Sequence, residues 1–291
     1  MRLRIVLFLV PLLLLGCGAG GGKAHGLKVV AAENVYGDIA SQIGGSHVSV
    51  TSVLTDPNAD PHLFEPGTAN GLAVANANVV IENGAGYDAF MAKLESATPS
   101  KRRVVVTIAT VLGVHGSDVN PHLWYDVPRL GRIAAAIAAG LRRADPAHAA
   151  AYDGGLRRFE RSLAPLRRKV ASIRARYAGT AVAYTEPVPG YLLAAAGLRN
   201  LAPTAFTRAI EDGTEPAPAA VAAMDALVAN HRIRVLLYNE QAVSPITKAL
   251  ADEARRAGIG VVGVTETLPA HTTFQQWQLG QARQLAAALA R

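Results

Sequence analysis

Short β-branched runs alternate with segments of helical periodicity along this chain, and no other feature constrains its fold as strongly. Runs typical of strands occur in both halves, at residues 28–32, 48–54, 79–81, 104–108, 181–184, 235–238 and 260–264. Helical spacing lies between several of them, at residues 32–43, 217–230 and 244–257, and again from about residue 274. Strands that alternate with helices favour parallel sheets with helices on both faces. We therefore expect an α/β protein.

The middle of the chain predicts one long amphipathic helix, at residues 145–177. Asp145 and Pro146 are typical of an N-cap and a first helical position. Apolar residues then recur along one face, at Tyr152, Leu156, Phe159, Leu163, Leu166, Val170, Ile173 and Tyr177. This helix would span roughly 45–50 Å, with a kink expected near Pro165. The predicted architecture is two similar β/α sandwich lobes, residues 27–144 and 178–291, joined by one long rigid helix and separated by a cleft.

The other face of the predicted long helix is basic. It carries Arg157, Arg158, Arg161, Arg167, Arg168, Lys169, Arg174 and Arg176. The whole chain has a formal net charge of +7, which is compatible with nucleic acid or with an anionic surface. Nothing else in the sequence favours nucleic acid. We interpret the face as solvated, and contact with anionic lipid or wall polymer is the alternative.

The N-terminus predicts export and a lipid anchor. Arg2 and Arg4 precede an apolar run at residues 5–15, which is about half of the ~20 residues that a membrane-spanning helix needs. The run ends in Leu-Leu-Gly-Cys, which resembles a bacterial lipobox, and Cys17 is the only cysteine in the chain. The resemblance implies a lipoprotein signal peptide at residues 1–16 and a lipidated, glycine-rich tether at residues 17–26. The protein would then be extracytoplasmic and anchored in the cell membrane; an ordinary signal peptide with an incidental cysteine is the alternative.

Polar side chains with metal-binding chemistry follow four of the predicted strands. They are His62, His122, Glu186 and Glu266. In open α/β sheets, ligands bind in the loops beyond the carboxyl ends of the strands, so one pair from each lobe would face the cleft. Imidazole nitrogen suits Zn²⁺, and carboxylate oxygen suits the harder Mn²⁺. Four protein ligands close the coordination sphere, whereas a catalytic metal needs an open position, so the pattern favours metal binding over hydrolysis.

At this point the chain resembles the ABC-importer solute-binding proteins that are specific for Mn²⁺ and Zn²⁺. The resemblance covers nearly everything after residue 27 and is carried by Asp-Pro-His-Leu-Phe-Glu-Pro at residues 60–66, Asn-Pro-His-Leu-Trp-Tyr-Asp at residues 120–126, and the long helix. It implies that both histidines are ligands and that Glu186 is the third. The fourth ligand is usually Asp in this family, so Glu266, one methylene longer, departs from the pattern.

The resemblance also implies a function. The protein would be no enzyme but a monomer that captures one Zn²⁺ or Mn²⁺ ion and hands it to a membrane permease driven by an ATPase subunit. A surface adhesin with incidental metal binding, and an importer protein for an organic solute, are the alternative functions. Many zinc-specific members carry a His-rich loop before the second ligand, whereas residues 111–120 contain only His115. This absence and Glu186 favour Mn²⁺, but the Irving–Williams order favours Zn²⁺, so the choice stays open.

Several further residues are candidates for supporting the site. Asp126 lies four residues after His122 and is able either to accept an imidazole hydrogen bond or to begin a helix. Glu240 and Gln241 follow a strand in the second lobe and would orient ligands or cap the next helix. Trp124 and Phe64 are expected to pack around the site. His271, five residues after Glu266, is the remaining histidine near it.

Overall fold

Each half of the chain forms its own four-stranded parallel sheet, as the alternation predicts. The computed structural model describes residues 26–56, 61–116 and 118–291, without the side chain of His62. The first sheet has the order β2-β1-β3-β4, with bounds Val48–Leu54, Leu27–Glu33, Val79–Glu82 and Val104–Thr107. The second has the order β6-β5-β7-β8, with bounds Arg199–Asn200, Ala181–Tyr184, Val235–Asn239 and Gly260–Val264. The expected fold class is confirmed.

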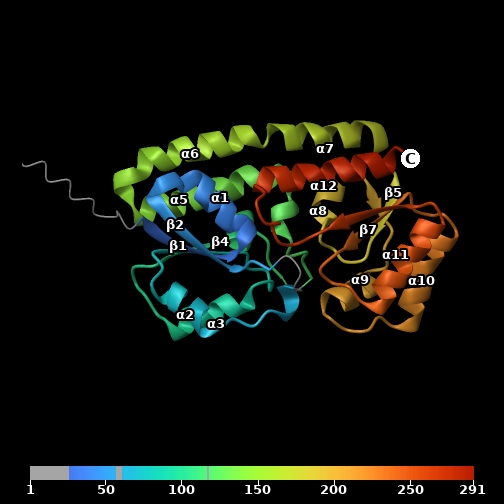
Figure 1. Cartoon of the computed structure of the whole chain (residues 1–291), viewed down its shortest axis with the longest axis horizontal. Coiled ribbons are helices and arrows are strands. Elements are labelled where there is room, and N and C mark those ends of the chain that lie inside the picture. Colours follow the sequence, from blue (N-terminus) through green and yellow to red (C-terminus); the bar gives the residue numbers. More distant parts are fainter. Residues whose placement is uncertain (1–25, 57–60, 117) are drawn as a thin grey trace, which may run out of the picture.

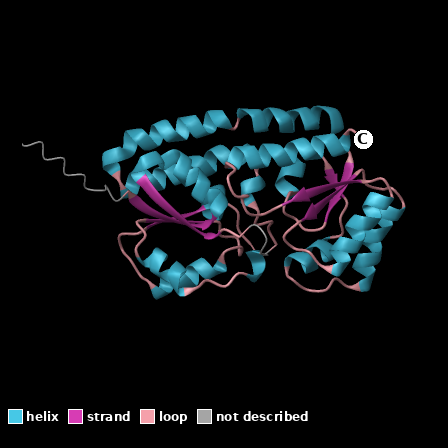
Figure 2. Ribbon diagram, viewed as in Figure 1, coloured by secondary structure: helices cyan, strands magenta, loops and turns pink. Residues whose placement is uncertain are grey.

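Helices cover both faces of each sheet (Figures 1 and 2). In the N-terminal lobe, one side carries α1 (Asn34–Gly44) and α5 (Leu130–Ala144), and the other carries α2 (Thr68–Ala75) and α3 (Ala89–Ala97). In the C-terminal lobe, one side carries α9 (Thr204–Glu211), α10 (Pro218–Ala229) and α11 (Pro245–Arg256). The short helices α4 (Ile108–Leu112) and α8 (Gly190–Ala195) follow strands β4 and β5. None of the described helices is long and apolar enough to cross a membrane.

The predicted connecting helix is present as two collinear segments along one long side of the molecule. A turn at Pro146–His148 leads into α6 (Ala149–Ser162), and α7 (Ala164–Tyr177) follows after the single residue Leu163. The interruption lies two residues before Pro165, whose missing N–H removes a helical hydrogen bond, so the helix is broken near the proline while the two segments stay in line. The predicted apolar stripe is turned inward, with Tyr152, Phe159 and Val170 among its buried members.

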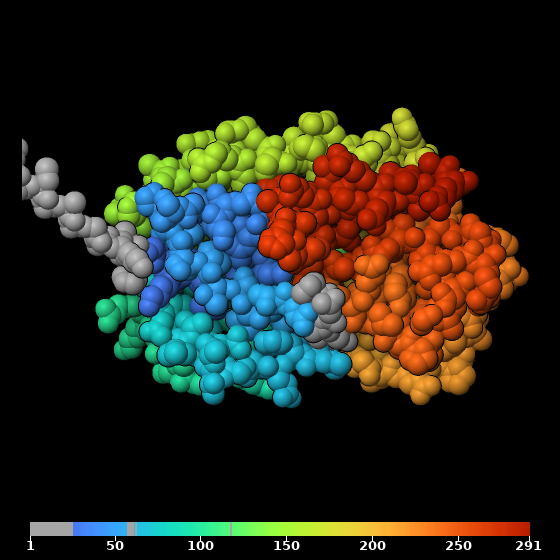
Figure 3. All heavy atoms as spheres, viewed as in Figure 1, coloured from blue at the N-terminus to red at the C-terminus, as the bar shows by residue number. Residues whose placement is uncertain are grey.

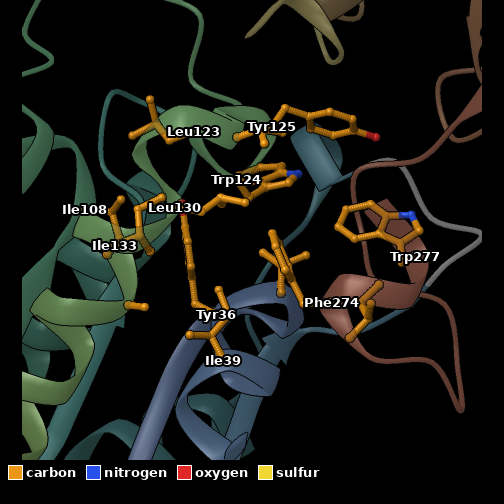
Figure 4. Close-up of a cluster of buried hydrophobic side chains, with 14 of the residues drawn as sticks. Tyr36, Ile39, Ile108, Leu123, Trp124, Tyr125, Leu130, Ile133, Phe274 and Trp277 are labelled. Atoms are coloured by element: carbon orange, nitrogen blue, oxygen red, sulfur yellow. The ribbon is translucent and has the colours of Figure 1, made fainter. Parts of the chain in front are cut away.

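The last helix joins the two lobes. Helix α12 (Phe274–Leu289) packs beside α7, and its first turn rests on α1 of the N-terminal lobe. There the backbone N–H of Phe274 donates to Asp38 Oδ2 at 2.9 Å. Figure 3 shows this terminal segment lying against the N-terminal lobe. A cluster of buried aromatic and aliphatic side chains fills the junction, with Tyr36, Trp124 and Trp277 drawn from three different elements (Figure 4).

This junction lies directly beneath the predicted ligands. Trp124 is fully buried, and its ring meets that of Tyr36 edge-on at 6.1 Å between centroids. The two described hydrophobic cores consist of residues between Val29 and Leu289. A chain that starts at Gly26 therefore contains the packing that holds both lobes together.

Candidate metal centre

Three of the four predicted ligands come together between the lobes, at the carboxyl ends of the strands. Glu186 follows β5 by two residues, and Glu266 follows β8 by two residues. His122 precedes the 3₁₀ turn Leu123–Tyr125 of the N-terminal lobe. All three side chains are buried, with 0–1% of their surface exposed. Because parallel strands end at the same edge of a sheet, this convergence is what the strand–helix alternation requires.

Glu266 is one of the residues through which the two lobes touch at the site. Its Oε2 lies 3.1 Å from His122 Nε2 and accepts a 2.8 Å hydrogen bond from the hydroxyl of Tyr87. Both of those partners belong to the N-terminal lobe. Burial raises the pKa of Tyr87 well above its usual value, and the charges of Glu266 and Glu33 add to this effect. Tyr87 therefore remains a hydrogen-bond donor to Glu266 over the physiological pH range.

Asn239, the last residue of β7, bridges the two carboxylates. Its amide nitrogen donates to Glu186 Oε2 at 2.5 Å and to Glu266 Oε1 at 2.8 Å. Its Oδ1 accepts from the backbone N–H of Gln241 at 3.0 Å, which fixes the orientation of the amide. Buried carboxylates are costly unless hydrogen bonds or a cation stabilise them. The Asn239 amide is therefore a common hydrogen-bond donor to two of the predicted ligands.

The imidazole of His122 is oriented by Asn120. Asn120 Nδ2 donates to the carbonyl of Pro187 at 2.6 Å, so its Oδ1 is the acceptor that faces His122 Nδ1 at 2.8 Å. Nδ1 is therefore the nitrogen that donates to Asn120, and Nε2 is the nitrogen directed at Glu266, where a metal ligand would need it. Because Pro187 belongs to the C-terminal lobe, this amide also ties the second histidine loop to the opposite lobe.

Asp126 does not accept a hydrogen bond from the imidazole of His122. Its carboxylate accepts from the backbone N–H of Arg129 at 3.2 Å and from Arg129 Nε at 2.5 Å. It therefore caps the turn at Val127–Arg129 and forms an ion pair with Arg129, three residues further along the chain. Of the two alternatives predicted for Asp126, the helix N-terminal one is observed.

Gln241 and Glu240 diverge at the end of β7. Gln241 is buried, and its Oε1 accepts from the backbone N–H of Glu266 at 2.6 Å and of Thr267 at 3.1 Å. It thereby holds the loop that carries the fourth predicted ligand. Glu240 is exposed and lies over Gly263, and no described hydrogen bond links it to a predicted ligand. Successive side chains of extended backbone point to opposite sides, so Asn239 and Gln241 face the site while Glu240 does not.

The remaining predicted residues are placed as follows. The backbone of His62 lies in the turn Pro61–Leu63, but its side chain lies outside what the structure describes. Trp124 packs edge-on against His122, with 5.5 Å between ring centroids, as expected. Phe64 is half-buried against Phe90 and lines a small hollow with Thr267, the residue after Glu266. His271 is exposed on the surface, so we assign it no part in the site.

Sequence reasoning missed four residues of the site, namely Tyr87, Asn120, Asn239 and Glu211. Glu211 ends α9, and its Oε1 lies 4.0 Å from His122 Nδ1. Asn120 lies in the motif that was recognised, but its role depends on a contact with the other lobe. Asn239 could have been found, since it stands at a strand's carboxyl end. No sequence pattern around Tyr87 or Glu211 indicates that these residues belong to the site.

The donor set fits a divalent transition metal. One imidazole nitrogen and two carboxylates are ligands for Zn²⁺ or Mn²⁺. Two donors ~2.1 Å from a tetrahedral ion lie ~3.4 Å apart, which is close to the 3.1 Å between His122 Nε2 and Glu266 Oε2. Among the described side chains, no three His, Cys, Asp or Glu residues already surround a common point.

Comparison with known proteins agrees with this chemistry. The family model described as "Zinc-uptake complex component A periplasmic" matches residues 29–288. The manganese-binding lipoprotein MntA of Bacillus subtilis is 29% identical over 159 residues, and that of Halalkalibacterium halodurans is 31% identical over 154. These matches cover 52% and 50% of this chain and 52% and 51% of those proteins. The chain thus spans about half the length of the curated relatives it matches.

Solved structures share the whole fold. The zinc-binding protein TroA of Treponema pallidum matches with a TM-score of 0.74 and 20% identity, over 90% of this chain and 99% of that one. The solute-binding protein FpvC of Pseudomonas aeruginosa in complex with Mn²⁺ matches with a TM-score of 0.76 and 20% identity, over 91% and 98%. At this level of identity the likeness concerns the arrangement of two lobes and a connecting helix.

Proposed function

Because the chain belongs to the family of zinc-uptake complex component A, we propose that it captures one divalent transition-metal ion outside the cytoplasm and delivers it to an ABC importer. The observation that carries this proposal is the buried group of His122, Glu186 and Glu266 between the lobes, with His122 Nε2 and Glu266 Oε2 3.1 Å apart. We assign these three residues and His62 as the ligands. The ion is cargo, and the protein is no enzyme.

The donor set accommodates both Zn²⁺ and Mn²⁺. Two carboxylates make the site harder than one built mainly of imidazoles, which favours Mn²⁺, while the Irving–Williams order favours Zn²⁺ at any equal site. The sequence relatives include manganese-binding lipoproteins, and the structural relatives include a zinc-binding protein and a complex with Mn²⁺. We propose that the protein binds both ions, with Zn²⁺ the tighter.

The proposed location is the outer side of the cell membrane. Cys17, the signal at residues 1–16 and the tether at residues 17–26 lie outside the described residues apart from Gly26. The two MntA relatives are named as lipoproteins. Loss of membrane retention in a Cys17→Ala chain would support lipidation, and unchanged retention would contradict it.

The mouth of the cleft has the character of a docking surface for the permease. A hollow of about 560 Å³ there is lined by Leu63 of the N-terminal lobe and by Val243 and Ile246 of the C-terminal lobe. Leu63 and Val243 are 71% and 58% exposed. Apolar side chains exposed beside a binding site mark a surface for another protein. We propose that a monomer docks there, on the permease that the ATPase subunit drives.

The surface-adhesin alternative has one structural parallel. A laminin-binding adhesin of Streptococcus agalactiae matches with a TM-score of 0.76 and 19% identity, over 91% of this chain. This parallel concerns the fold, and the buried donor set favours metal capture as the primary role. No described feature of the cleft favours import of an organic solute as strongly as the buried donor set favours capture of a metal ion.

The test is a binding titration of residues 26–291 after removal of metal with a chelator. We expect the chain to bind one equivalent of Zn²⁺. An equimolar amount of Mn²⁺ should displace only a small part of the bound Zn²⁺. His62→Ala and His122→Ala should each abolish high-affinity binding with the fold retained, whereas His115→Ala, at an exposed histidine, should not. Full affinity in both site variants would refute the assignment.

A further inference from the structure

Two helices on one side of the molecule form a surface without acidic residues. Residues 164–177 and 274–289, which form α7 and α12, include no Asp or Glu. Their cations are Arg167, Arg168, Lys169, Arg174, Arg176 and Arg283. All of them are exposed except Lys169, which is half-buried. Positive charge is therefore concentrated on these two helices, on a surface that we call the basic face.

Three cations of the basic face gather at a hollow between its two helices. α7 and α12 pack side by side, and a hollow of about 280 Å³ lies at their junction. Arg168, Lys169 and Arg283 line it together with the hydroxyl-bearing Ser172. Among the described residues, no ion pair involves any of these three cations. Like charges gathered without acidic partners create a local positive potential, which a phosphate group would neutralise.

The composition of the basic face restricts its partner. The large hydrophobic side chains that are exposed in the described structure are Leu63, Leu72, Val105 and Val243, and none of them lies on α7 or α12. Tyr177, half-buried at the end of α7, is the only aromatic residue of these helices that is not buried. Binding to single-stranded nucleic acid relies on aromatic stacking, and insertion into a bilayer relies on exposed apolar side chains. The features that remain are charge and an extended shape.

We propose that the basic face binds the phosphate-bearing surface of an anionic lipid bilayer. Two packed helices of 14 and 16 residues form a face ~20–24 Å long, and clusters of four to eight Lys and Arg residues are typical of anionic-membrane binding. A lipid anchor at Cys17, as proposed above, would keep this face near the membrane. Attraction without insertion makes the contact reversible and dependent on salt.

This contact sets the orientation of the protein. Figure 1 shows α7 and α12 on one long side and α9, which borders the mouth of the cleft, on the other. A chain that lies on its basic face therefore directs the mouth away from the bilayer, toward the source of metal. The chain must leave this position before the mouth meets a permease, so the contact stabilises a waiting state between deliveries.

Vesicle sedimentation with residues 26–291 tests the contact. We expect binding to phosphatidylcholine vesicles that contain phosphatidylglycerol, no binding to pure phosphatidylcholine, and release at 1 M salt, where the screening length falls to about 3 Å. Each cation near an anionic surface contributes about fivefold to partitioning. The variant Arg168→Gln/Lys169→Gln/Arg283→Gln should therefore lose on the order of 100-fold.

The matched control removes three exposed cations from the opposite side of the N-terminal lobe. Lys93→Gln/Lys101→Gln/Arg102→Gln changes the net charge equally, at positions on and after α3, and should bind within about twofold of the parent chain. Equal losses in the two variants would overturn the proposal. Binding to an anionic polymer such as heparin without binding to anionic vesicles would overturn it as well.

A single-thiol experiment tests the orientation. Residues 26–291 contain no cysteine, so a fluorophore attached to Ser172→Cys or Val243→Cys reports on one position. A quencher carried on lipid headgroups should quench the probe at position 172, in the hollow, and spare the probe at position 243, at the mouth. Equal quenching at both positions would overturn the proposed orientation.

Discussion

Removal of the Asn239 amide should destabilise the metal-free protein much more than the metal-bound protein. This amide donates to Glu186 and Glu266 at 2.5 and 2.8 Å. A hydrogen bond to a charged group contributes about 1.5–3 kcal/mol, so Asn239→Leu, which keeps the approximate shape, should lower the free energy of unfolding by about 3–5 kcal/mol. At about 2–4 °C per kcal/mol for a chain of this size, the Tm should fall by about 6–20 °C.

A bound metal ion should recover most of that loss. The cation takes over the stabilisation of both carboxylates, so the rise in Tm on adding Zn²⁺ should be larger in Asn239→Leu than in the parent chain. Differential scanning calorimetry of residues 26–291 at pH 7.5, with chelator and with metal, measures both quantities.

The matched control for this prediction is a second buried amide. Gln278 is fully buried in α12, and its side-chain amide has no hydrogen-bond partner among the described residues. Gln278→Leu should therefore leave the Tm nearly unchanged or raise it, with an unaltered response to metal. An Asn239→Leu protein that is destabilised equally with and without metal would refute the idea that these carboxylates hold the ion.

Three further predictions concern other parts of the structure. Asn120→Ala should weaken metal binding by about 10–100-fold because it releases the imidazole it orients, whereas Asp126→Ala should leave the affinity unchanged in the same titration. Burial raises the pKa of Asp88 to about 6, so the folded state holds this proton more tightly than the unfolded state. Relative to Asp88→Asn, the parent chain should lose about 2 kcal/mol of unfolding stability as the pH rises from 4 to 7, measured by denaturant titration. A methyl group on Gly155 would lie 2.0 Å from a backbone oxygen of α1, but one on Gly154 would meet only an arginine tip at 3.4 Å, so Gly155→Ala should lower the Tm and Gly154→Ala should raise it.

The architecture was predictable because its signals are local. The strands at residues 48–54 and 260–264 were predicted with the observed bounds, since the first alternates apolar and polar residues and the second is a short valine-rich run. The connecting helix was predictable from one apolar stripe and one proline. The helix Thr204–Glu211 was not predicted, and with it Glu211 was missed near His122.

The sequence predicted that His122, Glu186 and Glu266 lie close together, but not which residues hydrogen-bond to them. Histidine and glutamate at strand ends are visible in the sequence, whereas the partner of each one depends on how the lobes meet. The four-residue spacing between His122 and Asp126 suggested a hydrogen bond from the imidazole, but the carboxylate of Asp126 accepts from Arg129 instead. The amide that orients His122 comes from Asn120, and its geometry is set by Pro187 of the other lobe.

The central claim is that one metal ion binds between the lobes, and anomalous diffraction from metal-soaked crystals tests it most directly. The proposal predicts a single strong peak about 2.0–2.2 Å from His122 Nε2 and from the carboxylates of Glu186 and Glu266, with the Asn239 amide displaced. A peak elsewhere, or no peak in crystals of a chain that binds one equivalent of metal in solution, would contradict it.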